Sequence, residues 1–122
     1  MCRVLIVEDE EKLAAFVAKG FRRHGFIPTV VTDGEQALRL TQTNTYDVIL
    51  LDLGLPLKDG WAVLRELRAR GDNHPVVVMT AFSDRRQDVL AAGANGYIPK
   101  PFRFRDLLTM VHGFADGCVE AA

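Results

Sequence analysis

Short, uninterrupted apolar runs alternate along this chain with longer segments in which apolar residues recur every three or four positions. The first run, residues 3–7 (RVLIV), is apolar and β-branched at consecutive positions, as in a strand that is buried on both faces. The segment that follows places Leu13, Phe16, Val17 and Phe21 on one helical face. A strand buried on both faces needs a covering layer on each side. The alternation therefore predicts an α/β fold in which helices cover both faces of a parallel sheet.

The same alternation continues to the end of the chain. The expected strands are residues 3–7, 27–31, 47–52, 75–79 and 96–98. The expected helices run from about Leu13 to Phe21, over 33–44, from Trp61 to a stop at Gly71, over 84–92, and from Phe104 to Phe114. Five strands that alternate with five helices indicate a doubly wound five-stranded parallel sheet.

Local signals support several of these boundaries. Gly25 and Gly71 follow helical segments and are expected to end them. Residues 32–35 (TDGE) form a capping-box pattern at the start of the second helix, and Ser83 is expected to cap the fourth. Pro28 favours the start of a strand or an exposed edge, because proline cannot donate to a central sheet ladder.

Length and charge limit the class of protein. The 122 residues suit one domain over 1–122, with a core at about 3–115 and a tail at 116–122. Lys and Arg total 15 and Asp and Glu total 16, for a net charge of −1, so we expect no direct binding of nucleic acid. No apolar stretch approaches a membrane span, and we expect no membrane insertion.

The two cysteines, Cys2 and Cys118, stand at opposite ends of the chain. Their spacing matches neither a metal site nor a disulfide framework. We therefore expect a reduced, cytoplasmic setting.

Polar residues follow the apolar runs at the places where strands are expected to end. Glu8 and Asp9 follow the first run, Asp52 ends the third, Thr80 follows the fourth and Lys100 follows the fifth. The carboxyl ends of strands in a doubly wound sheet form the ligand-binding edge, so these side chains should meet. Three carboxylates and one ammonium leave a charge of −2 there. The oxygen-only ligand set favours Mg²⁺ or Mn²⁺ over zinc and suits phosphoryl transfer to a carboxylate.

Each of these residues also has an ordinary structural interpretation. Acids after a strand can simply begin a helix, where they interact favourably with the helix dipole. Asp52 could cap a turn, Thr80 and Tyr97 are common strand residues, and Lys100 could be a solvated lysine. The functional interpretation depends on their joint placement at successive strand ends.

Four segments together resemble the receiver domain of two-component response regulators, and the resemblance covers about residues 3–115. They are VLIVEDEE (4–11), DVILLDLGLPLKDGW (47–61), VVVMTAF (76–82) and GANGYIPKPF (93–102). The resemblance implies a flavodoxin-like, CheY-like sheet with strand order 2-1-3-4-5.

The resemblance also implies roles for particular residues. Asp52 matches the phosphoacceptor, and Lys100 and Thr80 match the lysine and hydroxyl that contact the phosphoryl group. Thr80 and Tyr97 match the switch pair. The implied Mg²⁺ ligands are Glu8, Asp9, Asp52 and the backbone carbonyl of Gly54, with Asp9 the more direct ligand of the acidic pair. Lys100–Pro101 matches a cis peptide bond.

A receiver of this kind takes a phosphoryl group from the phosphohistidine of a histidine kinase or phosphotransfer protein. It then switches a surface built from the fourth helix, fifth strand and fifth helix to control an effector domain or output protein. It catalyses only its own phosphorylation and dephosphorylation and is not an enzyme for an external substrate. Exposed alanines of the first helix, Ala15 or Ala18, are candidates for kinase docking.

Two questions stay open from the sequence. A homodimer is possible, but Asn95-Gly96 replaces the acidic pair that many dimerising regulators carry, and no Lys or Arg follows Arg105 in the last helix. The main alternative function is a pseudo-receiver, a protein-interaction module that works without phosphorylation. An FMN-binding domain is disfavoured because residues 8–11 (EDEE) would repel phosphate, and the phosphate-binding motif of P-loop nucleotidases is absent from the chain.

Overall fold

The computed structural model describes residues 2–81 and 85–115 and contains a five-stranded parallel sheet in the order β2-β1-β3-β4-β5. The strands are β1 (Arg3–Val7), β2 (Ile27–Val31), β3 (Val48–Asp52), β4 (Val76–Thr80) and β5 (Gly96–Pro99). The helices are α1 (Glu11–Arg23), α2 (Gly34–Thr43), α3 (Gly60–Ala69), α4 (Arg86–Ala91) and α5 (Phe104–Phe114). The expected fold class and strand order are confirmed.

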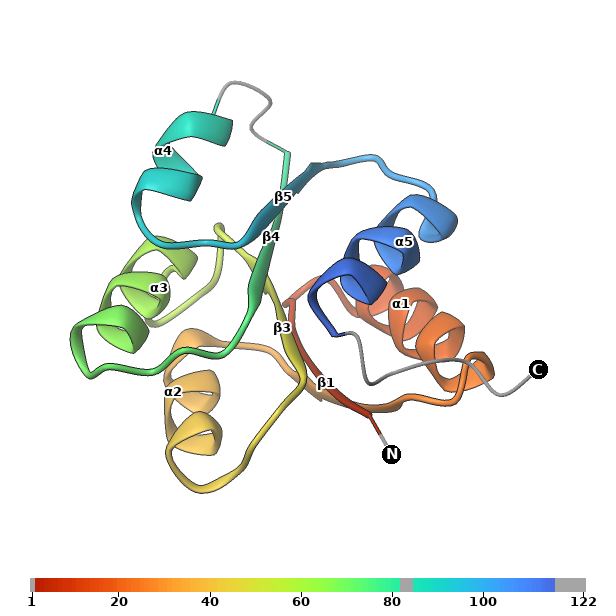
Figure 1. Ribbon diagram of the computed structural model, residues 1–122, viewed down its shortest axis with the longest axis horizontal. Helices are drawn as coiled ribbons and strands as arrows, with labels where there is room; N and C mark the ends of the chain where they lie inside the picture. The colour runs from red at the N-terminus through yellow and green to blue at the C-terminus, as the bar shows by residue number, and fades with distance from the viewer. Residues whose placement is uncertain (1, 82–84, 116–122) are drawn as a thin grey trace.

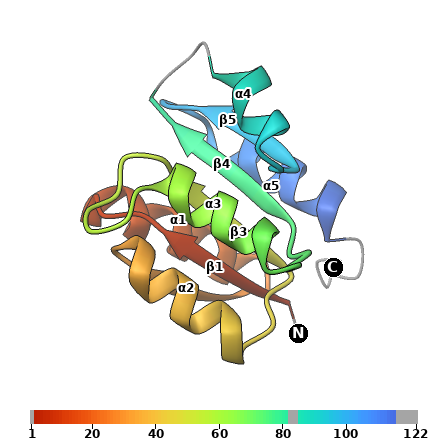
Figure 2. The same cartoon turned by 90° about the vertical axis from the view of Figure 1, so that its left-hand side faces the viewer.

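Helices cover both faces of the sheet. Figure 1 shows α1 and α5 on one side of the strands and α2, α3 and α4 on the other. The turned view in Figure 2 shows α2 and α3 side by side in front of β1 and β3. The sheet is therefore the middle layer of three.

The central strand β3 explains why its sequence is apolar at consecutive positions. Successive side chains of a strand point to opposite faces. Val48 and Leu50 enter the apolar cluster under α1 and α5, and Ile49 and Leu51 enter the cluster under α2 and α3. All four are fully buried. The strand β2 lies at one edge of the sheet, as the proline at position 28 indicated.

Some element boundaries differ from those expected. The fourth strand begins at Val76 instead of Pro75, because Pro75 contributes only its carbonyl, which accepts a hydrogen bond from Ile49 N at 2.8 Å. The strand extends instead to Thr80. The fourth helix is shorter than expected and begins at Arg86. Its expected cap, Ser83, lies outside the described residues.

The cap of α2 is one residue later than the sequence pattern indicated. The Asp33 side chain, not that of Thr32, accepts a hydrogen bond from Gln36 N at 2.8 Å. Gln36 Oε1 in turn accepts one from Thr32 N at 3.4 Å. A carboxylate is a strong acceptor at this position, so the helix begins where aspartate can cap it.

The expectation about the cysteines is wrong for Cys2, which is disulfide-bonded. Cys2 packs on the apolar cluster that also holds Val111 and Ala115 at the end of α5. The two ends of the fold thus lie on the same side of the sheet. Their separation along the sequence therefore did not indicate their separation in space. Cys118 lies outside the described residues.

Among the helices of residues 2–81 and 85–115, none is both long and apolar enough to cross a membrane.

Candidate functional site

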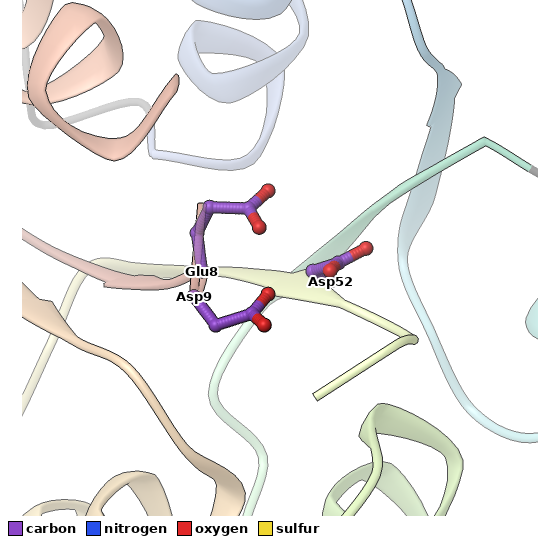
Figure 3. Close-up of side chains that lie close together, drawn as sticks. All are labelled: Glu8, Asp9 and Asp52. Atoms are coloured by element: carbon purple, nitrogen blue, oxygen red, sulfur yellow. The ribbon is translucent and has the colours of Figure 1, made fainter. Parts of the chain in front are cut away.

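Three carboxylates meet at the carboxyl ends of β1 and β3. Ligand atoms of Glu8, Asp9 and Asp52 all lie within 4.8 Å of one another. Figure 3 shows Glu8 and Asp9 extending from the end of β1 toward Asp52 at the end of β3. The predicted meeting of these side chains is what the structure shows.

The sheet sets the positions of these acids. β1 and β3 are neighbours, so their ends bring residues 44 positions apart in the chain into contact. Glu8 N donates to Val31 O at 3.0 Å, which extends the pairing of β1 with β2 by one residue. Asp52 is still part of β3 and lies opposite Met79 of β4. Glu8 and Asp52 are therefore held by strand backbone, whereas Asp9 lies beyond the strand and is exposed.

Lys100 closes the site from the other side. Its Nζ lies 2.7 Å from Glu8 Oε1 and 3.4 Å from Asp52 Oδ1. Its backbone amide donates to Thr80 O at 2.7 Å, and the Lys100–Pro101 peptide bond is cis. The lysine thus touches two of the three acids, and its shorter contact is with Glu8.

The electrostatics follow from burial and from this pairing. Glu8 is 1% exposed. Burial and the nearby charge of Asp52 raise the pKa of Glu8, although its contact with Lys100 works in the opposite direction. Burial alone would lower the pKa of Lys100, but Glu8 and Asp52 outweigh it and the pKa is raised. Lys100 therefore stays protonated at neutral pH, beside more negative charge than it can balance.

The loop after β3 brings the Gly54 backbone beside the acids. A methyl group at Gly54 would lie 3.9 Å from Asp52 Oδ2, and Gly54 itself is exposed. The loop closes where Gly60 N donates to Leu53 O at 2.9 Å. Gly54 therefore lies close to the Asp52 carboxylate.

Thr80 and Tyr97 lie deeper in the fold. Thr80 is 1% exposed at the end of β4, and its carbonyl is tied to the backbone of Lys100. Tyr97 is 7% exposed and belongs to the apolar cluster that also holds Val89 of α4. Thr80 therefore adjoins the site through the backbone of Lys100, and Tyr97 lies within the core on the α4 side of the sheet.

The donor set fits a small divalent cation. Its side-chain ligands are carboxylate oxygens, which Mg²⁺ prefers. Asp9 supplies an exposed carboxylate beside two buried ones. The excess negative charge beside Lys100 is an independent reason for a cation to bind here.

Sequence reasoning missed the close pairing of Lys100 with Glu8. It placed both residues at one edge and counted Lys100 against the three acids together, but the only contact it assigned to Lys100 was with a phosphoryl group. The docking suggestion needs a similar correction. Ala18 is only 5% exposed because it packs against the sheet, whereas Ala15 is exposed.

Comparison with known proteins places the chain among signalling domains. The family model described as "Response regulator receiver domain" matches residues 4–112. The transcriptional activator protein IrlR of Burkholderia pseudomallei (strain 1026b) is 44% identical over 111 residues, which cover 89% of this chain and 48% of that protein. The chain thus spans about half the length of such curated relatives.

The solved structures that resemble this chain include receiver domains as well. The receiver domain of the Francisella response regulator 1452 has a TM-score of 0.91 and 34% identity, over 96% of this chain and 98% of that one. The receiver domain of the sensor histidine kinase PA1611 from Pseudomonas aeruginosa has a TM-score of 0.86 and 33% identity, over 94% of this chain and 98% of that one. That structure has a magnesium ion coordinated in its active-site cleft.

Proposed function

This chain belongs to the response regulator receiver domain family, and from that premise we propose that Asp52 accepts a phosphoryl group from a histidine kinase or phosphotransfer protein. The observation that carries the proposal is the cluster of three carboxylates with Lys100 at 2.7 Å from Glu8 and 3.4 Å from Asp52. We propose that the chain works as one receiver domain.

The reaction at Asp52 is a displacement at phosphorus. A carboxylate oxygen of Asp52 forms the new O–P bond while the P–N bond of the donor phosphohistidine breaks, and its electron pair stays on the imidazole nitrogen. The product is an aspartyl phosphate. The Lys100 ammonium, 3.4 Å from Asp52 Oδ1, would help to orient the attacking carboxylate.

The other residues of the site would position and stabilise the phosphoryl group. The Lys100 ammonium would interact with the phosphoryl oxygens, and the Thr80 hydroxyl would donate a hydrogen bond to one of them. Glu8, Asp9, Asp52 and the carbonyl of Gly54 would hold Mg²⁺. When bound, Mg²⁺ would offset the negative charge of the transferring group.

Phosphorylation would then act on a surface. Thr80 ends β4 just ahead of α4 in the chain, and Tyr97 shares an apolar cluster with Val89 of α4. A hydrogen bond from Thr80 to the phosphoryl group would bias the surface of α4, β5 and α5 between two states. An effector domain or output protein, or a second copy of the chain, would respond to that change.

A pseudo-receiver is the alternative function. Such a module would bind its partner without using the acidic site. The complete set of acids and lysine in one cluster favours a phosphorylated receiver.

Mass spectrometry of the intact chain separates the two functions. Treatment with acetyl phosphate and Mg²⁺ should add about 80 Da, the mass of a phosphoryl group. The same treatment without Mg²⁺, or of the Asp52→Asn variant, should add nothing. Mass gain in Asp52→Asn would contradict the assignment of the acceptor, and the lack of any gain in the wild type would favour the pseudo-receiver.

A further inference from the structure

The loop at residues 53–59, which carries Gly54, rests against the first residue of α2. A methyl group at Gly34 would come within 2.1 Å of the Lys58 carbonyl oxygen, 2.7 Å of Val63 Cγ2 and 3.0 Å of the Lys58 carbonyl carbon. Atoms cannot approach this closely. A side chain at position 34 would have to displace either α2 or the loop.

Glycine is needed at this position for space and not for its backbone freedom. Gly34 begins α2 with a conformation outside the positive-φ region, in contrast to Gly25, Gly71 and Gly93. An alanine here would be compatible with the helix itself. Its cost would come from the contact with the loop.

Of the two segments in this contact, the loop is more easily displaced than α2. α2 is held by its Asp33 cap, by buried Ala37 and Leu38, and by Arg70 Nη1, which donates to Leu38 O at 3.3 Å. In the loop, Leu57 is 78% exposed and has a φ of 65°, a left-handed conformation that is unfavourable for leucine. The loop should therefore move before the helix does.

Displacement of the loop would alter the site, because the loop and the site share one stretch of backbone. Asp52 and Gly54 lie at the start of the segment that ends at Lys58, and a methyl group at Gly54 would lie only 3.9 Å from Asp52 Oδ2. We propose that Gly34 is a positioning residue for the metal site. Because Gly34 has no side chain, the loop can pack closely against α2, and this packing aligns the Gly54 carbonyl with the carboxylates. This inference rests on the proposed function, from which the role of Gly54 comes.

The test is Mg²⁺ binding by calorimetry, with circular dichroism to verify folding. Gly34→Ala should bind Mg²⁺ roughly tenfold more weakly than the wild type, as for other changes to groups that orient metal ligands. The matched control is Gly113→Ala on α5, where a methyl group would meet no described atom within 4 Å. This control should bind Mg²⁺ with wild-type affinity.

A second variant identifies the contact that matters. Val63→Ala removes the Cγ2 contact but leaves the Lys58 carbonyl in place. Gly34→Ala/Val63→Ala should therefore bind Mg²⁺ as weakly as Gly34→Ala. Full recovery of affinity in the double variant would overturn the route through Lys58.

The remaining outcomes are distinguishable. A wild type that does not bind Mg²⁺ contradicts the proposed function itself, whereas a Gly34→Ala variant with wild-type affinity overturns only the role of Gly34. If Gly34→Ala does not fold, hydrogen exchange of the wild type decides. Mg²⁺ should slow exchange at the amides of residues 34–36 as well as in the loop, and unchanged exchange at 34–36 would overturn the inference.

Discussion

At the scale of single residues, the acidic site places function in conflict with stability. Glu8 and Asp52 are 1% and 7% exposed and share the ammonium group of Lys100. Burial of like charges at such short range is unfavourable. The site is therefore expected to be more stable with one carboxylate removed.

Asp52→Asn should raise the free energy of unfolding by about 1 kcal/mol in the absence of divalent cations, as is common when a strained functional site is relieved. Urea denaturation at pH 7 in the presence of EDTA measures this free energy of unfolding. Asp88→Asn is the matched control, because the Asp88 side chain is 62% exposed, and it should change stability little. A less stable Asp52→Asn variant would contradict the expected repulsion.

Asp72 gives the opposite case, a carboxylate that stabilises the fold. Burial alone would raise its pKa, but hydrogen bonds from the His74 backbone and ring, together with Arg70, lower it below the ordinary value. A carboxyl whose pKa is lower in the folded state contributes stability above its unfolded pKa. That contribution disappears as the pH falls through the folded value.

Asp72→Ala should therefore cost roughly 1.5–3 kcal/mol at pH 7, the usual range for hydrogen bonds to charged groups. The difference from the wild type should shrink as the pH falls below the ordinary range of aspartate, roughly 3.9. Thermal unfolding of the wild type and the variant between pH 3 and about pH 7 would measure this pH dependence. A difference that stays constant over this range would show that charge is not the cause.

At the scale of elements, the helices differ in how they begin. Asp33 and Asp59 cap α2 and α3 by accepting hydrogen bonds from Gln36 N at 2.8 Å and Ala62 N at 2.9 Å. Glu10 precedes α1 and makes no side-chain cap bond within the described residues. α1 must therefore depend more on its buried face, which includes Val17 and Phe21.

Asp33→Ala and Asp59→Ala should each lower stability by about 1 kcal/mol, because each removes the acceptor for a helix-terminal N–H group. Glu10→Ala is the internal control and should have little effect. Chemical denaturation of the three variants compares them. Equal losses at all three positions would contradict the assignment of the caps.

At the scale of the whole molecule, one sheet joins two apolar clusters. Leu50 of β3 packs on the α1 and α5 side and Leu51 on the α2 and α3 side, and both are fully buried. Loss of either cluster would expose the same strand. The two sides should therefore unfold together.

Leu50→Ala and Leu51→Ala should each cost about 2–5 kcal/mol, the usual range for a buried leucine. Each variant should show a single transition by both circular dichroism and Trp61 fluorescence. Leu57→Ala, at a position 78% exposed, should have little effect. Separate transitions for the two probes would show that the clusters unfold independently.

The layers of the fold, and the meeting of the acids with Lys100, could be predicted from the amino-acid pattern alone. Short runs of consecutive apolar, β-branched residues, as in residues 48–51, are typical of a strand buried on both faces. Because parallel strands end at one edge, Glu8, Asp9, Asp52 and Lys100 were predicted to meet there. These inferences depend on local patterns, which a sequence displays directly. The strand order was implied only by the resemblance, because apolar periodicity does not say which strands are neighbours.

Contacts between segments that are distant in the chain became known only from the three-dimensional fold. It placed Lys100 nearer to Glu8 than to Asp52, and it set Gly34 against the Lys58 carbonyl. It also gave Cys2 a disulfide. The physical reason is the same in each case: such contacts depend on the packing of whole elements, whose separation in space is not encoded at either position alone.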